Sequence, residues 1–307
     1  MRLLVVGAGS TGGYFGGRLA QAGRDVTFLV RPNRAAQLAA KGLEIVSPHG
    51  GFTLTPKTAA AGSIDGPYDM ILLTVKAYSL EAALDDAAPA VGPGTMILPV
   101  LNGMRHVDLL TARFGADSVL GGVCRIAAHL DSQGRVVQLS KFHDLAYGEM
   151  SGALSPRAGQ FDAFMQNAGF DAKLSPSIER EMWEKWVLLA TLGGITCLMR
   201  GSVGEIVAAP GGGSFINQFL DEVAGIVAAV GVPPDEKALA QTRAMLTAQG
   251  SAFTSSMYRD LQDGGPIEAG QIIGDLLVRA RQANISAPLL ALAYTHLVIY
   301  ENRRSAS

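Results

Sequence analysis

The chain has 307 residues, which is enough for about two domains at the usual ~100–200 residues per domain. Its 25 basic and 27 acidic residues nearly cancel, and they form no basic run of the kind that nucleic acid binding requires. Apolar residues make up 48% of the sequence and charged residues only 17%, a balance that excludes a disordered protein and favours large buried cores.

Neither an export signal nor a membrane anchor is expected. The apolar run at residues 3–6 is too short for the core of a signal peptide. A membrane span needs ~20 predominantly apolar residues, whereas the long uncharged stretch at residues 282–300 is interrupted by polar residues and a proline. Cys124 and Cys197 lie far apart and are expected to be buried thiols without a disulfide. This usage favours a cytoplasmic protein.

The N-terminal residues carry the clearest motif of the sequence. An apolar run at residues 2–6 predicts a buried strand, and it leads directly into a glycine-rich turn. Apolar residues then recur at helical spacing until Gly23, and a second strand is predicted at residues 25–30. A strand, a glycine-rich turn, a helix and a second strand in this order are typical of a dinucleotide-binding fold.

The glycines of this turn have separate physical roles. Gly7 allows the tight turn, Gly9 lets a pyrophosphate approach the backbone, and Gly12 lets the helix pack closely on the strand. The pyrophosphate would lie at the helix N-terminus, where free N–H groups and the helix dipole favour an anion. An incidental glycine turn is the alternative. The residues expected to bind the cofactor here are Gly7, Ala8, Gly9, Ser10, Thr11 and Gly12.

The end of the second strand indicates which nucleotide is bound. NAD-binding folds place Asp or Glu there to hold the ribose 2′-hydroxyl, and this sequence has no acid at that point. Arg31 can instead pair with a 2′-phosphate, and Arg34 adds to the positive field. The pattern favours NADP(H) over NAD, with two solvated surface arginines as the alternative.

Two polar residues follow later strands of this half. Lys76 and Asn102 come just after the apolar runs at residues 70–75 and 95–100, which are predicted to be parallel strands. The carboxyl ends of such strands bind ligands in open α/β sheets, so both residues are candidates for cofactor binding. A solvated lysine and an ordinary Asn-Gly turn are the competing explanations. Further strands are predicted at residues 43–46, 52–55, 119–124, 136–139, 145–148 and 172–174, and helices at residues 79–88 and 161–168.

From residue 176 onward, long helical patterns replace alternating strands and helices. We therefore expect the α/β class, with a Rossmann-type dinucleotide-binding domain at residues 1–176 and an all-α domain at residues 177–307. The apolar helical half could also supply the surface of a homodimer. The helices are predicted at residues 178–199, 215–230, 235–248, 266–284 and 289–302.

Three residues of the helical half have both an ordinary and a functional explanation. Lys185 lies on a helix face whose neighbouring positions are apolar, so it is snorkelling, functional, or simply paired with Glu181 at i,i+4. Pro266 predicts a helix start that places Glu268 in the first turn, where the helix dipole favours a carboxylate. Ser256 is explained equally well as a polar helix residue.

Taken together, these segments resemble the ketopantoate reductase (2-dehydropantoate 2-reductase) family over nearly the whole chain. The resemblance implies a Rossmann domain followed by a helical domain of the 6-phosphogluconate dehydrogenase C-terminal type. It also implies the NADPH-dependent reduction of a 2-oxo acid to a 2-hydroxy acid. The segments that carry it are GAGSTGGYFG, FLVRPNR, TVKA, LNGM, Trp183-Glu184-Lys185, and Ser255-Ser256-Met257 followed by Glu268.

The resemblance further implies a role for each candidate residue. Lys185 would be the general acid that protonates the carbonyl oxygen as hydride arrives, and Glu268 would orient Lys185 or bind a substrate hydroxyl. Ser256 would bind the substrate. Asn102 would contact both substrate and cofactor, and Lys76 would lie near the adenosine phosphate.

In one respect the sequence departs from the family pattern. Ketopantoate reductases commonly have asparagines one and two turns after the lysine, where they contact substrate, and this chain has Leu189 and Gly193. Losing two amides should change specificity. Two alternatives therefore stay open: a reductase or dehydrogenase of the same fold acting on another small hydroxy acid or an imine, and an NADP-binding sensor without chemistry. The five histidines show no close pairs in the sequence, so no metal is expected.

Overall fold

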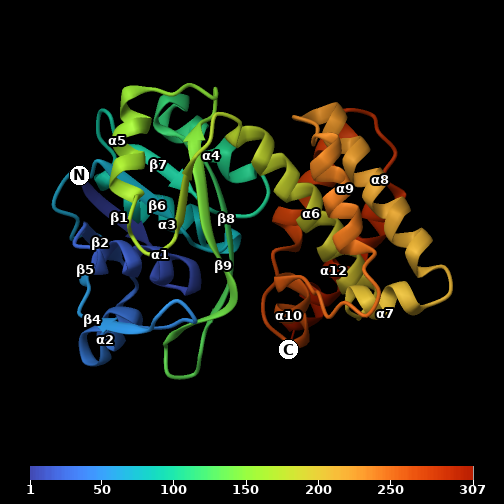
Figure 1. Cartoon of the computed structure of the whole chain (residues 1–307), viewed down its shortest axis with the longest axis horizontal. Helices are drawn as coiled ribbons and strands as arrows, with labels where there is room; N and C mark the ends of the chain where they lie inside the picture. The colour runs from blue at the N-terminus through green and yellow to red at the C-terminus, as the bar shows by residue number, and fades with distance from the viewer. Residues whose placement is uncertain (307) are drawn as a thin grey trace. The chain divides into compact units, whose positions relative to one another are not determined.

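The structure, a computed structural model, describes residues 1–306 and divides into two compact units. The first, which we call the sheet unit, comprises Met1–Leu101 and His106–Ile178. The second, which we call the helical unit, comprises Asn102–Arg105 and the described chain from Glu179 onward. In Figure 1 the sheet unit runs from blue to yellow-green, and the helical unit, apart from Asn102–Arg105, runs from yellow to red.

The central sheet of the sheet unit is entirely parallel, with strand order β5-β2-β1-β6-β7. The chain leaves β1 toward β2 on one side and later returns to β6 on the other. The order of the strands therefore reverses at β1, and such a reversal opens a ligand crevice at the carboxyl ends of the strands. The strands are β1 (Arg2–Val6), β2 (Asp25–Leu29), β5 (Lys57–Ala59), β6 (Met70–Leu73) and β7 (Met96–Pro99).

Both faces of this sheet are covered, which explains why its strands are continuous apolar runs. Leu3 and Val5 of β1 belong to a buried cluster with residues of α1 and of a second sheet. Leu4 and Val6 point to the opposite face, into a cluster with residues of α3 and α4. The helices of this part, seen in Figure 1, are α1 (Ser10–Gln21), α2 (Pro32–Lys41), α3 (Leu80–Ala87), α4 (Arg105–Phe114) and α5 (Pro156–Met165).

The second sheet has the order β10-β9-β3-β4, with β8 paired to β9. Its antiparallel pair β3–β4 confirms the two strands predicted at residues 43–46 and 52–55. The prediction of two strands at residues 136–139 and 145–148 is wrong, because β9 is one strand that pairs with β8 on both sides of a register shift, which lies between the pairs Ile126–His143 and Ala128–Gln138. The strands are β3 (Leu43–Val46), β4 (Phe52–Leu54), β8 (Leu120–Leu130), β9 (Val136–Glu149) and β10 (Asp171–Leu174).

The helical unit contains four of the five predicted long helices, as α6, α8, α9 and α12, and two short helices that the sequence pattern did not reveal, α7 and α10. No helix among the described residues is long and apolar enough to cross a membrane. Both cysteines are free thiols; Cys197 is buried and Cys124 half-buried. The elements are α6 (Ile178–Met199), α7 (Val203–Ala208), α8 (Gly212–Val230), α9 (Glu236–Leu246), α10 (Ser256–Gln262), the π-helical turn η4 (Gly270–Gly274), α11 (Asp275–Gln282) and α12 (Pro288–Ala306).

The predicted helix start at Pro266 is wrong, and the reason lies in contacts distant in sequence. The N–H of Gly265 donates to Asp260 O at 2.8 Å, and the Tyr300 hydroxyl donates to Gly265 O at 2.7 Å. These bonds hold the segment against α10 and α12 in a non-helical conformation. Helical structure begins at Ala269, so Glu268 precedes the helix instead of lying in its first turn.

Two histidines of the sheet unit, His49 and His143, form a stacked pair. The rings of His49 and His143 stack with their centroids 3.8 Å apart, and the Tyr14 hydroxyl lies 2.8 Å from His143 Nδ1. Burial, with a smaller contribution from the charge of His49, lowers the pKa of His143 below its usual value of 6.5. The folded protein therefore favours the neutral ring, and the unfolded chain binds the proton more readily.

The free energy of unfolding should consequently fall as the pH drops from about 7.5 through the ordinary histidine pKa near 6.5. In His143→Gln, which keeps a polar partner for Tyr14, this fall should be smaller. Urea unfolding of both proteins at several pH values between these limits measures the difference. Burial also lowers the pKa of His296. Because His296 is present in both proteins, its contribution to the pH dependence is the same in both and cancels in the difference. An identical pH dependence in the two proteins would contradict the assignment.

Candidate active site

The glycine turn after β1 has the geometry that its sequence requires. Gly7 has a φ of +97°, a left-handed conformation that favours glycine. A Cβ on Gly12 would lie 2.1 Å from Gly7 O and 2.2 Å from Thr74 Oγ1, so no side chain fits there. Thr74 Oγ1 also donates to Val6 O at 2.9 Å, which ties the turn to the end of β6. The turn is therefore fixed from two neighbouring strands.

The N-terminus of α1 is open to a ligand. A Cβ built on Gly9, the residue that precedes the helix, would meet no atom within 4 Å. No side chain caps the helix start, and its first turn contains no acidic residue. Free N–H groups, a positive helix end and an open approach at Gly9 fit the pyrophosphate of a dinucleotide.

Arg31 lies beside the segment that begins at Lys76. It is the exposed residue preceding α2, and its guanidinium donates to Ser79 Oγ at 3.2 Å. Lys76, also exposed, precedes the short 3₁₀ turn η1 (Ala77–Ser79). The predicted cofactor residues that follow β2 and β6 are thus brought to one edge of the sheet. Ser79 was not identified from the sequence, which predicts it as the first residue of a helix at residues 79–88.

Arg34 braces the glycine turn. Its Nε donates to Ala8 O at 3.0 Å, and its Nη1 donates to Gly134 O at 2.9 Å. It is half-buried, and burial lowers the pKa of its guanidinium. The positive field expected of Arg34 is therefore accompanied by a structural function that the sequence pattern did not indicate.

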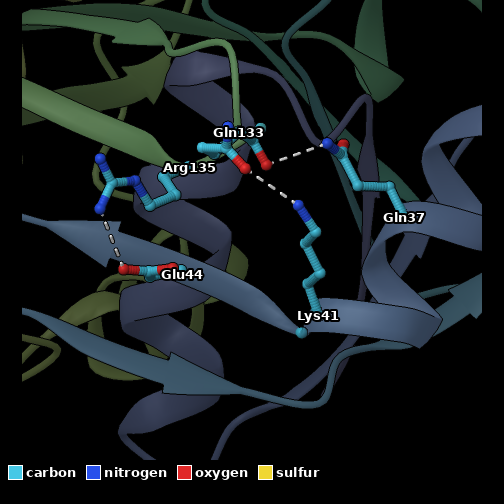
Figure 2. Close-up of a pocket in the computed structure, with 7 residues that line it drawn as sticks. Gln37, Lys41, Glu44, Gln133 and Arg135 are labelled. Atoms are coloured by element: carbon cyan, nitrogen blue, oxygen red, sulfur yellow. Dashed lines mark hydrogen bonds and ion pairs between the residues drawn. The ribbon is translucent and has the colours of Figure 1, made fainter.

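The sheet unit also contains a cavity of about 260 Å³ at the far end of α2 from Arg31. Figure 2 shows its polar side chains directed toward one another. Gln37 Nε2 donates to Gln133 O at 3.1 Å, and Lys41 Nζ donates to Gln133 Oε1 at 3.2 Å. Arg135 Nη1 forms an ion pair with Glu44 Oε1 at 3.6 Å. Because these groups are already paired, we do not include the cavity in the candidate site.

In the helical unit, two of the predicted site residues are in contact. Asn102 Nδ2 donates to Glu268 Oε2 at 3.3 Å. Glu268 is 6% exposed, so its carboxylate is held in a largely buried position. Gln271, which was not singled out from the sequence, donates from Nε2 to Asn102 O at 2.9 Å. Gly103 has a φ of +77°, so the Asn-Gly turn and the candidate site occupy the same residues.

Lys185 is half-buried on α6, and it takes no part in the bond between Asn102 and Glu268. One and two turns later on the same face lie Leu189, half-buried, and Gly193, buried. A Cβ on Gly193 would lie 2.7 Å from Met257 Cε. The methionine therefore fills the space that a side chain at residue 193 would need.

Helix α10 is attached to α6 beside these residues. Ser255 caps α10 by accepting the N–H of Tyr258 at 2.9 Å, and its hydroxyl lies 2.9 Å from Thr196 Oγ1 of α6. Ser256, half-buried, and Met257, 2% exposed, follow directly. The cap thus explains why Met257 packs against Gly193.

Comparisons with known proteins agree with this architecture. The family model "Ketopantoate reductase PanE/ApbA" matches residues 3–152, and the model of the C-terminal part of the same family matches residues 177–301. An uncharacterized oxidoreductase of Bacillus subtilis, YkpB, is 35% identical over 98% of this chain and 99% of its own length. Both the family resemblance and the α/β fold class with a helical second domain are thereby confirmed.

Two solved structures are similar over the same length. That of 2-dehydropantoate 2-reductase from Geobacter metallireducens has a TM-score of 0.87 and 28% identity, covering 97% of this chain and 99% of that one. That of D-mandelate dehydrogenase with NADH and anilino(oxo)acetate has a TM-score of 0.88 and 19% identity, covering 99% and 100%, which shows a shared fold. On the two family models and the relative of B. subtilis, this chain is an oxidoreductase that belongs to the ketopantoate reductase family.

Proposed function

We propose that this protein uses NADPH to reduce a 2-oxo acid to the corresponding 2-hydroxy acid. The observation that carries the proposal is the open glycine turn at Gly9, with Arg31 on the same sheet edge, in a chain of the ketopantoate reductase family. When bound, the reduced nicotinamide supplies a hydride. The main-chain N–H groups that follow Gly9 would hold the pyrophosphate.

Arg31 is the basis for choosing NADPH over NADH. Its guanidinium is exposed and donates to the neutral hydroxyl of Ser79, so a 2′-phosphate could replace or share that partner. Lys76, exposed in the same segment, would add a second positive charge near the adenosine phosphate. The residues proposed to bind the cofactor are Gly7, Ala8, Gly9, Ser10, Thr11, Gly12, Arg31, Lys76 and Asn102.

Lys185 is proposed to be the general acid. Negative charge develops on the carbonyl oxygen as the carbon accepts hydride, and an ammonium beside that oxygen stabilises the charge and then donates the proton. Glu268 would orient the lysine or bind a substrate hydroxyl, while it keeps the amide of Asn102 in place. Ser256 would bind the substrate. A sensor that only binds NADP would have no need of Lys185, so we favour the enzyme.

The substrate side chain is proposed to meet an apolar surface. Leu189 and Gly193 follow Lys185 on its helix face, and the methyl group of Met257 covers Gly193. A hydroxyl on the substrate would have no amide partner at these two positions. An apolar 2-oxo acid is therefore a better candidate than ketopantoate itself, which carries a hydroxymethyl group.

A matched pair of substrates tests this preference. Trimethylpyruvate is ketopantoate without the hydroxyl oxygen, so the ratio of their kcat/KM values isolates that one group. A site that hydrogen-bonds the hydroxyl rejects the analogue lacking it by about 10⁴–10⁵, whereas an apolar site discriminates against the hydroxyl by about 10² at most. We expect trimethylpyruvate to be reduced at least as well as ketopantoate. Leu189→Asn should shift the ratio toward ketopantoate, and a strong preference of the native protein for ketopantoate would contradict the proposal.

The domain boundary near residue 176 stays a prediction. The homodimer also stays a prediction, and it can be measured. Light scattering during size-exclusion chromatography measures the mass of the assembly directly. A mass close to the 32.1 kDa of one chain would contradict the homodimer.

A further inference from the structure

A turn of π-helix lies directly after Glu268. It comprises Gly270–Gly274, and the N–H of Asp275 bonds back to Gly270 O. Such turns are rare and are frequently found at functional sites. Here the turn is supported from outside, because Trp186 Nε1 donates to Ile272 O at 2.8 Å from a fully buried indole. The turn is thus fixed to α6 by the residue that follows Lys185.

Gln271 lies in this turn and is 6% exposed. Its Nε2 donates to the main-chain oxygen of Asn102 at 2.9 Å, while Glu268 accepts the side-chain amide of Asn102 at 3.3 Å. A Cβ on Gly103 would lie 2.8 Å from Gln271 O, so the turn containing Asn102 packs directly on Gln271. Asn102 is therefore held at two points, its main chain by Gln271 and its side chain by Glu268.

The two hydrogen bonds that hold Asn102 differ in length. The bond to the side chain of Asn102 is long, and the next residue has the left-handed backbone conformation of a turn. The shorter bond from Gln271 fixes the main chain from which that side chain projects. Without it, the amide of Asn102 could move relative to Glu268 even though the carboxylate itself stays in place.

We propose that Gln271 is a positioning residue, which holds Asn102 so that its amide and the Glu268 carboxylate keep a fixed relative geometry during the reaction. This inference rests on the proposed function, in which Asn102 and Glu268 act on substrate and cofactor. Gln271 itself is assigned no contact with either.

The main variant is Gln271→Met, which keeps the volume of the side chain and removes the donor. Its control is Gln138→Met, since Gln138 is also 6% exposed and donates to two main-chain oxygens, in the sheet unit. Melting temperatures should fall in both. With trimethylpyruvate and ketopantoate as substrates, kcat should fall about tenfold to 100-fold in Gln271→Met alone, because small displacements of reacting groups cost this much. Equal kcat in Gln271→Met and the native protein overturns the proposal.

A double-mutant cycle separates this inference from the proposed function. If Gln271 acts through Asn102, Gln271→Met should have no further effect on kcat in a protein that already carries Asn102→Ala. Fully independent effects of the two substitutions would overturn the proposal. Impairment by Asn102→Ala but not by Gln271→Met would overturn it and leave the proposed function standing. A native kcat in Asn102→Ala would overturn the proposal together with the role given to Asn102, while the reduction of the oxo acid itself would stand.

Gln271→Glu is the second variant, because it matches glutamine in shape and should fold. Its carboxylate cannot donate to Asn102 O, whereas the protonated carboxyl can. The kcat of this variant relative to the native protein should therefore rise as the pH is lowered. A ratio that stays constant with pH overturns the proposal.

Discussion

Replacing Lys185 with alanine should lower kcat by about 10²–10⁴, the usual contribution of a positioned general acid. Lys185 lies half-buried on α6, with Leu189 one turn further along the same face. Removing its ammonium would leave the carbonyl oxygen without its proton donor and without the nearby positive charge. Single-turnover kinetics with NADPH and the faster of the two oxo acids measure the chemical step directly.

The matched control is Lys237→Ala, which removes an exposed lysine from α9 of the same unit. Its kcat should equal that of the native protein. NADPH should bind Lys185→Ala about as tightly as the native protein, because the lysine is not among the proposed cofactor residues. Near-normal turnover in Lys185→Ala would refute the general-acid role.

Replacing Arg31 with alanine should weaken NADPH binding by about 10- to 100-fold. Hydrogen bonds to charged groups contribute about 1.5–3 kcal/mol, and each 1.4 kcal/mol is a factor of ten in the dissociation constant. NADH has no 2′-phosphate, so its binding should change little. Titration of each nucleotide, followed by its fluorescence, gives the two dissociation constants.

Arg113→Ala is the control for charge, since Arg113 belongs to α4 and is paired with Asp85 at 2.7 Å. It should alter neither constant. Ser79→Ala should have a smaller effect than Arg31→Ala, because it removes only a neutral hydroxyl. Equal losses of NADPH and NADH binding in Arg31→Ala would contradict the assignment of the 2′-phosphate.

Segments whose conformation is set by residues close in the sequence could be predicted from the sequence. The strand at residues 2–6, the glycine turn after it and the helix up to Gln21 all follow from apolar spacing and from positions where only glycine fits. Helix α6 was predicted with its observed bounds because its pattern is long and uninterrupted. In these segments local preference and tertiary packing favour the same conformation.

Segments whose conformation is set by contacts with other parts of the chain could not be predicted from the sequence. Strand β9 is one strand that pairs with β8 on both sides of a register shift, and helical structure starts at Ala269 because Gly265 is bonded to Asp260 and Tyr300. Two residues of the candidate site could not be predicted for the same reason. Nothing in the sequence near Gln271 or Ser79 indicates that their partners lie on other segments.

Whether the protein reduces an oxo acid is tested most directly by following the transferred hydride. The protein is incubated with an oxo acid and NADPH that carries deuterium at one of the two positions on C4 of the reduced ring. We expect a 2-hydroxy acid with deuterium on carbon 2 from one labelled form of NADPH and not from the other, as mass spectrometry would show. Tight NADPH binding without any labelled hydroxy acid, for either form and for every oxo acid tried, would contradict the proposed reductase function and favour a sensor.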